Sequence, residues 1–108
     1  MVVNVCPAAT STAPPERFWS LVTSPERFGE WVDGRVVSVN PPGEMRPGQV
    51  TRMVSPAFGR EWPVRIEVGA MDPGRRWIDL VAYLPFGVAN YEHLTLTETD
   101  GGTLVRFN

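Results

Sequence analysis

The chain has 108 residues, a length that predicts a single domain. Its formal net charge is −2 and its isoelectric point is about 5.3, so it lacks the basic surface that nucleic acids require, and we expect no nucleic-acid partner. Hydrophobic residues make up 43% of the sequence and charged residues 20%, which excludes a disordered or fibrous chain.

Several absences narrow the chemistry. All ten positively charged residues are arginines, and without lysine neither Schiff-base chemistry nor a phosphate-loop lysine is available. Cys6 is the only cysteine and His93 the only histidine, so we expect no metal and no cofactor, with Cys6 a buried apolar residue of the first strand. The sequence has no apolar run of about 18 residues and no signal-peptide pattern, which predicts a cytoplasmic protein without a membrane span.

The N-terminal part predicts one strand and two short helices. Val2–Cys6 reads as the strand, and Ser11 and Thr12 follow as candidate helix caps. The tetrapeptide Pro-Glu-Arg-Phe then occurs twice, at residues 15–18 and 25–28. Each copy has proline where a helix begins, an acidic residue in the first turn and then apolar residues at helical spacing. We interpret the two copies as two helix starts, because two ten-residue units are too few for a repeat architecture.

From Gly34 onward the hydrophobic period changes from 3.6 to 2, which predicts strands. Short turns rich in proline and glycine separate them, so neighbouring strands should pair antiparallel as a meander. Pro63 lies inside one of them and requires an edge position or a bulge, since it cannot donate to the sheet. The expected strands are Arg35–Val39, Gln49–Ser55, Arg60–Val68, Arg76–Leu84, Ala89–Thr97 and Gly102–Phe107.

The expected sheet has one strongly apolar face. On the third of these strands Val64, Ile66 and Val68 share a face, and the alternation directs Arg65 and Glu67 to solvent. Two short helices are too small to cover such a face, so we expect a ligand, a partner chain or a missing element to cover it. The next two strands add to the same face Ile78, Leu80, Ala82, Leu84, Leu94 and Leu96.

Four features of the sequence point to a known family. They are the order of the elements, the segment APPERFWSLVTSPERFGEW, the turn DPGRRW and the ending LPFGVANYEHLTLTETDGGTLVRF. With these features, the chain resembles the START-like superfamily, also called SRPBCC, over Val2–Phe107. This is the helix-grip fold of polyketide cyclase/dehydrase and lipid-transport proteins. The resemblance implies one α+β domain over residues 1–108, in which a curved antiparallel sheet of six to seven strands surrounds an apolar cavity and two short helices close one end.

The resemblance also implies a final strand and a long C-terminal helix, and we expect both to be missing from a chain that stops at Asn108. The helix would normally form one wall of the cavity. Without it we expect Leu80, Leu94, Leu96 and Phe107 to be exposed. A homodimer or other self-association through this face, or a longer natural protein, would then be needed.

The resemblance places Phe28 and Trp31 at the cavity mouth, with Met53 as an adaptable wall residue. Plain core packing is the alternative for Trp31. Trp77 and Tyr83 share a strand face that mixes aromatic and polar groups. That composition suits a ligand pocket and a half-exposed sheet face equally well.

Tyr91 and His93 share a face of one strand by alternation. Such a pair could exchange a proton with a bound carbonyl compound, since histidine titrates near neutrality and tyrosine can donate to an oxyanion. The alternative is that both side chains lie on the outer face, opposite Leu94 and Leu96. The residues alone leave both arrangements open.

Three functions remain open. The first is binding of a small hydrophobic or aromatic metabolite, such as a polyketide or a lipid. The second is an enzyme of the aromatase/cyclase type, with Tyr83, Tyr91, His93 and Arg65 as candidate residues, although the sequence contains no catalytic signature. The third is an interaction module whose open face grips a helix of another chain.

Overall fold

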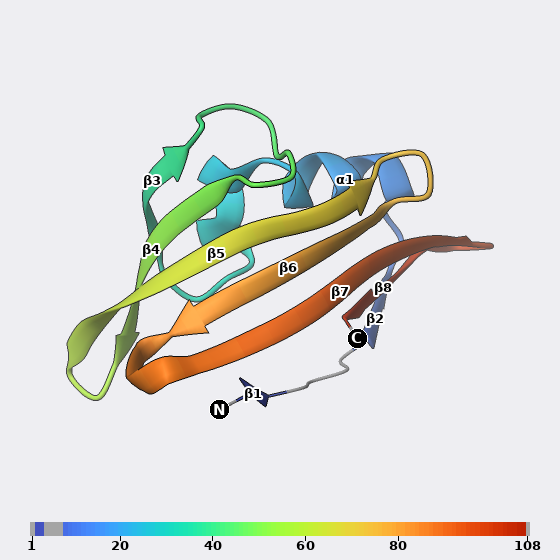
Figure 1. Cartoon of the computed structure of the whole chain (residues 1–108). Helices are drawn as coiled ribbons and strands as arrows, with labels where there is room; N and C mark the ends of the chain where they lie inside the picture. Colours follow the sequence, from blue (N-terminus) through green and yellow to red (C-terminus); the bar gives the residue numbers. More distant parts are fainter. Residues whose placement is uncertain (1, 4–7, 108) are drawn as a thin grey trace.

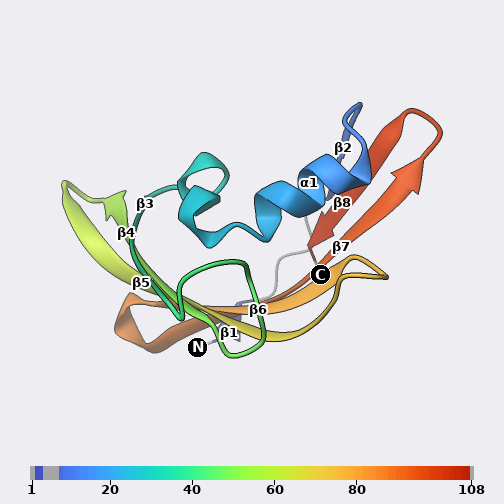
Figure 2. The ribbon, with the colours of Figure 1, turned by 90° about the horizontal axis from the view of Figure 1, so that it is seen from above.

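The computed structural model describes residues 2–3 and 8–107. A curved sheet forms the body of the protein, and the first two helices along the chain lie on its concave side (Figures 1 and 2). The helices are α1 (Pro15–Val22) and two 3-10 helices, η1 (Pro25–Glu30) and η2 (Pro85–Gly87). The strands are β1 (Val2–Val3), β2 (Ala8–Ser11), β3 (Arg35–Asn40), β4 (Val50–Ala57), β5 (Arg60–Asp72), β6 (Trp77–Leu84), β7 (Val88–Thr99) and β8 (Gly102–Phe107).

The sheet runs in the order β2-β8-β7-β6-β5-β4-β3. Every pair in this path is antiparallel, so the expected meander from β3 to β8 is confirmed. The short strand β1 lies off the path and pairs parallel with β7, with Val2 opposite Ala89. The fold is therefore α+β, with the curved antiparallel sheet and the two short helices that the sequence predicted.

The N-terminal segment differs from the expectation. Of the strand predicted over Val2–Cys6, only Val2–Val3 is described as a strand, and Cys6 lies outside the described residues. The strand that completes the edge of the sheet is β2, so Ser11 belongs to a strand instead of capping a helix. The cap position of α1 is Pro14, which makes no side-chain hydrogen bond. Pairing with β8 outweighs the local cap preference of Ser11 here.

The interpretation of the repeated tetrapeptide as two helix starts is confirmed, because α1 begins at Pro15 and η1 at Pro25. The second helix, however, is a 3-10 helix of six residues. Its cap residue Ser24 does not cap it, since the hydroxyl donates to the backbone oxygen of Ser20 at 2.7 Å. A short 3-10 helix of this kind derives its stability mainly from packing.

Strand β5 is an edge strand at Pro63, as expected. Residues Arg60–Glu67 pair with β4, whereas pairing with β6 begins only at Arg65, so Pro63 has a strand neighbour on one side. Further along, the register between β5 and β6 shifts between Val68 and Met71. Such an irregularity increases the local twist and bends the strand.

The expectation that Leu80, Leu94 and Leu96 would be exposed is wrong, because all three are buried, and Phe107 is half-buried. The reason is that α1 contacts β7 and η1 contacts β3, so the two helices cover more of the concave face than their length suggested (Figure 2). The buried core consists of Val22, Phe28, Met45, Met53, Ile66, Val68, Ile78, Leu80, Leu94 and Leu96.

The loop between β3 and β4 adds to this cover. Gln49 is fully buried, and its side-chain nitrogen donates to the backbone oxygens of Pro41, Gly43 and Glu44 at 2.9, 3.1 and 3.3 Å. The backbone N–H of Met45 donates to the oxygen of Thr23 at 3.0 Å, which ties the loop to the end of α1. No helix in the described part of the chain is long and apolar enough to cross a bilayer.

Candidate functional site

A cavity of about 340 Å³ lies on the concave face, between the end of η1 and strands β4 to β8. Apolar side chains form most of its wall, and the polar groups are few. This is the usual character of a small-molecule site. The lining residues are Trp31, Val32, Asp33, Met53, Ser55, Val64, Ile66, Leu80, Ala82, Leu84, Glu92 and Phe107.

Trp31 and Met53, both expected as ligand-binding residues, contribute to the wall of this cavity. Phe28 does not line it, because its side chain is fully buried behind Trp31. The rings of Phe28 and Trp31 meet edge to face, with their centroids 5.2 Å apart. The ring of Phe107, which belongs to β8, has its centroid 6.2 Å from that of Trp31. The Nε1 atom of Trp31 is buried and has no hydrogen-bond partner among the described residues.

Glu92 is a cavity residue that the sequence analysis did not single out. It lies opposite Leu80 in the β6–β7 pair, and alternation along β7 places it on the same face as Leu94. Its Oε1 accepts a hydrogen bond from Nδ2 of Asn90 at 3.1 Å, while its Oε2 is buried without a partner in the part of the chain that is described. Burial raises the pKa of the Glu92 carboxyl, and the Asn90 hydrogen bond opposes this only in part.

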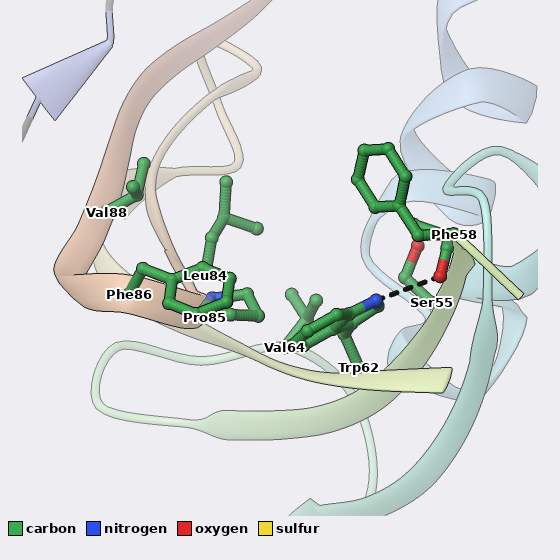
Figure 3. Close-up of a pocket in the computed structure, with 9 residues that line it drawn as sticks. Ser55, Phe58, Trp62, Val64, Leu84, Pro85, Phe86 and Val88 are labelled. Carbon is green, nitrogen blue, oxygen red and sulfur yellow. Dashed lines mark hydrogen bonds between the residues drawn. The ribbon is translucent and has the colours of Figure 1, made fainter. Parts of the chain in front are cut away.

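An outer pocket of about 300 Å³, here called the vestibule, adjoins the cavity and shares Ser55, Val64 and Leu84 with it. Its side chains come from the β4–β5 and β6–β7 hairpins, whose turns lie at the same end of the sheet (Figures 1 and 3). The other residues that line the vestibule are Ala57, Phe58, Trp62, Pro85, Phe86 and Val88.

Aromatic side chains dominate the vestibule. Phe58 is 96% and Phe86 87% exposed, and both sit at hairpin tips with positive φ angles of 51° and 66°. Trp62 lies between them and is held by a hydrogen bond from its Nε1 to the backbone oxygen of Ala57, at 2.9 Å (Figure 3). Its ring is 5.3 Å from the ring of Phe86, and the Arg60 guanidinium lies 4.2 Å from its centroid. These contacts fix Trp62 but leave the two phenyl rings open to solvent.

The remaining four predicted site residues lie on the opposite, convex face. Tyr91 and His93 alternate with the cavity residue Glu92 on β7, and Trp77 and Tyr83 alternate with Leu80 and Ala82 on β6. The structure therefore has the second of the two arrangements left open for Tyr91 and His93. It does not bring these four residues together with Trp31 and Met53.

The convex face has its own network of contacts. His93 Nδ1 lies 2.5 Å from Asp79 Oδ1, and its ring is 5.3 Å from that of Trp77. Arg65 lies 4.3 Å from the Tyr83 ring centroid and 3.6 Å from a carboxylate oxygen of Glu67, on the solvent side as expected. Desolvation, together with the Glu67 carboxylate, raises the pKa of Tyr83.

A curved antiparallel sheet that grips short helices around an apolar cavity defines a helix-grip protein. The sequence matches the family described as polyketide cyclase/dehydrase and lipid transport over residues 4–108, and the chain belongs to this family. No curated protein matches it.

Solved structures agree on the fold. A protein from Rhodobacter sphaeroides is similar with a TM-score of 0.72 at 21% identity, covering 93% of this chain and 67% of that one. Ara h 8.0201 is similar with a TM-score of 0.73 at 18% identity, covering 95% and 72%. DynU16, a protein of the dynemicin biosynthetic locus, is similar with a TM-score of 0.70 at 25% identity, and the match covers 95% of this chain but only 35% of DynU16.

Proposed function

We propose that the protein binds a small hydrophobic or aromatic metabolite in the concave cavity, with the vestibule as its entrance. The observation that carries this proposal is an apolar cavity of about 340 Å³ that continues into an aromatic-lined pocket of about 300 Å³. Binding sites for small molecules commonly measure ~300–1,000 Å³ and combine apolar walls with a few polar groups. Membership of the polyketide cyclase/dehydrase and lipid transport family supports a ligand of this class.

Two neighbouring residues of β6 allow a sharp test. Ala82 lines the cavity, whereas Val81 precedes it on the same strand and points to the convex face. Ala82→Phe should fill the cavity, and Val81→Phe adds a ring of the same size outside it. The probe is 1-anilinonaphthalene-8-sulfonate, followed by fluorescence titration, with naphthalene derivatives as competitors.

The expected result is saturable dye binding that the competitors displace. Val81→Phe should retain this binding. Ala82→Phe should weaken it by about tenfold or more, which corresponds to ~1.4 kcal/mol of binding free energy. Equal binding by the two variants would place the ligand elsewhere. Absence of saturable binding by the folded wild-type protein, across dye and competitors, would count against the proposal as a whole.

A second candidate function is catalysis of cyclisation or dehydration on a bound polyketone. The observation that favours it is Glu92, a carboxyl-bearing residue in the wall of an apolar cavity. A neutral carboxylic acid there could protonate a keto oxygen or a departing hydroxyl group. Tyr91 and His93 lie on the other face and would not reach the same ligand. If a substrate is turned over, Glu92→Gln should lower kcat at least about 100-fold, while His93→Gln should not.

Self-association stays a prediction. Leu84 lies at the edge of the cavity and is exposed. A second copy of the chain could cover it. Native mass spectrometry of freshly purified protein reports the oligomeric state and any retained small molecule in one spectrum. A dimer would support the prediction, and a bare monomer at all accessible concentrations would remove it without affecting the ligand-binding proposal.

A further inference from the structure

The convex face has a hollow of its own, on the opposite side of the sheet from the cavity. It measures about 390 Å³ and lies between strands β5, β6 and β7. Gly69 of β5 adds no side chain to it, and a Cβ atom at that position would lie 3.5 Å from Cβ of Asp79 on the neighbouring strand. The side chains of Asp79, Val81, Tyr91 and His93 line this hollow.

The imidazole of His93 is fixed on two sides. Its Nδ1 lies 2.5 Å from Oδ1 of Asp79, which is directly opposite on β6, and its ring lies 5.3 Å from the ring of Trp77. A carboxylate only accepts, so Nδ1 carries the proton of this hydrogen bond. In the neutral ring the lone pair is then on Nε2, which has no hydrogen-bond partner among the described residues.

This arrangement is one that makes an imidazole an effective nucleophile. A carboxylate that accepts from one ring nitrogen fixes the tautomer and the orientation of the ring, and it stabilises the positive charge that the ring gains in a reaction. The Nε2 lone pair of His93 is in addition accessible, since the residue lines an open hollow.

Tyr91 adds a hydrogen-bond donor to the same hollow. It lies two residues before His93 on the same face of β7 and is 48% exposed. A phenol O–H can donate to a carbonyl oxygen, and this contact strengthens as the oxygen gains negative charge under attack. The hollow thus combines an oriented nucleophile with a donor for the oxygen of the group that it attacks.

We propose that this hollow is an acyl-transfer site, in which His93 is the nucleophile and Asp79 the positioning residue, and that its substrates are activated aryl esters of small acids. Nε2 attacks the ester carbonyl carbon, the bond from that carbon to the aryl oxygen breaks, and the phenolate leaves with the electron pair. Water then hydrolyses the acyl-imidazole. This step releases the carboxylic acid, restores the neutral ring and leaves one proton for the phenolate. The proposal is independent of the proposed function, since no side chain of the cavity takes part.

The sequence makes a sharp test possible, because His93 is the only histidine and the chain has no lysine. The probe is para-nitrophenyl acetate, and the release of para-nitrophenolate is followed with wild type, His93→Gln, Asp79→Asn and Tyr91→Phe. Free imidazole at the same concentration is the reference. Asp100→Asn is the matched control, since it makes the same substitution at an exposed carboxylate in the β7–β8 turn.

We expect wild type to exceed free imidazole by about tenfold or more, because the hollow holds the ester beside an oriented ring. His93→Gln should fall to the background of the N-terminal amine and Cys6, which it retains. Asp79→Asn should lower the rate by about tenfold or more, and Tyr91→Phe should lower it less. Asp100→Asn should leave the rate unchanged.

Two further measurements assign the roles independently of the rate. With the hindered ester para-nitrophenyl trimethylacetate, which slows hydrolysis of the intermediate, mass spectrometry should find the acyl group on His93. Long-range proton–nitrogen NMR spectra of the single imidazole should show the proton on Nδ1 in wild type and a mixture of tautomers in Asp79→Asn.

Equal hydrolysis by wild type and His93→Gln would overturn the proposal, and so would a wild-type rate no higher than that of free imidazole. Both results would leave the proposed function intact. Inhibition by saturating 1-anilinonaphthalene-8-sulfonate would indicate a reaction in the cavity and would overturn the proposal as well.

Discussion

Phe28 packs edge to face against Trp31, with ring centroids 5.2 Å apart and ring planes at 76°. The fully buried ring of η1 thus supports the ring that lines the cavity. Aromatic pairs in this geometry contribute ~0.5–1.5 kcal/mol beyond the area that they bury. One residue therefore links the stability of the helix to the shape of the site.

We predict that Phe28→Ala lowers the free energy of unfolding by about 3–5 kcal/mol, since it leaves a cavity that the surrounding core fills only in part. Phe58→Ala is the matched control: the same substitution at a residue that is 96% exposed should change stability by less than ~0.5 kcal/mol. Urea unfolding followed by tryptophan fluorescence measures both. Similar losses for the two variants would contradict the burial of Phe28.

Two adjacent glycines in the β7–β8 turn should respond very differently to alanine. A Cβ atom on Gly102 would approach the backbone oxygen of Ser11 to 1.9 Å, and Gly102 has a φ angle of 149°. A Cβ on Gly101 would meet nothing within 4 Å. Gly102→Ala should therefore cost about 2–4 kcal/mol and loosen the β2–β8 pair, whereas Gly101→Ala should be neutral. Thermal unfolding of the two variants, side by side, checks this prediction.

Glu92 and Glu30 should contribute to stability with opposite dependence on pH. Because burial raises the pKa of Glu92 in the folded protein, its contribution is fully present below its unfolded pKa and is lost as pH rises through the folded value. Hydrogen bonding to Arg27 lowers the pKa of Glu30, so its contribution is present above the unfolded pKa and is lost as pH falls through the folded value.

The measurement is the free energy of unfolding of Glu92→Gln and Glu30→Gln relative to wild type, from about pH 3 to about pH 8. Glu92→Gln should gain stability relative to wild type as pH rises. Glu30→Gln should instead lose stability relative to wild type as pH rises through the acidic range. The same trend for both variants would show that Glu92 is not desolvated in the folded state.

Substitutions on the convex face and in the cavity should differ in their effect on ligand affinity. His93→Ala and Tyr91→Ala remove convex-face side chains and should leave the affinity for naphthalene ligands within about twofold. Trp31→Ala removes part of the cavity wall. It should weaken the affinity for naphthalene ligands about tenfold or more, which corresponds to a loss of ~1.4 kcal/mol of binding free energy. A large loss of affinity in His93→Ala, with an unchanged fold, would show that the ligand binds on the convex face.

Much of the fold followed from hydrophobic periodicity. Alternation assigned Val64, Ile66 and Leu80 to one face, and the structure lines the concave cavity with all three. The same rule could have identified Glu92, because it lies two residues before Leu94 and hence on the apolar face. A carboxyl group on an otherwise apolar strand face is therefore the sequence signal for this cavity residue.

Other features depended on contacts that periodicity does not encode. Met45 enters the core from an irregular loop whose position is set by Gln49, and this is part of why the concave face is better covered than the helix lengths implied. Phe58 and Phe86 form the vestibule only because two separate hairpins end side by side. Neither arrangement has a local sequence pattern.

The register shift between Val68 and Met71 has a consequence for how this family member can change over time. Side chains alternate between the two faces, so sliding β5 by one residue against β6 would exchange every cavity residue of β5 for an outward-facing one. Insertions within the strands should therefore be tolerated only where a bulge, like the one between Val68 and Met71, absorbs the extra residue. The tips that carry Phe58 and Phe86 are free of this constraint, and variation in their length would remodel the entrance while the interior stays the same.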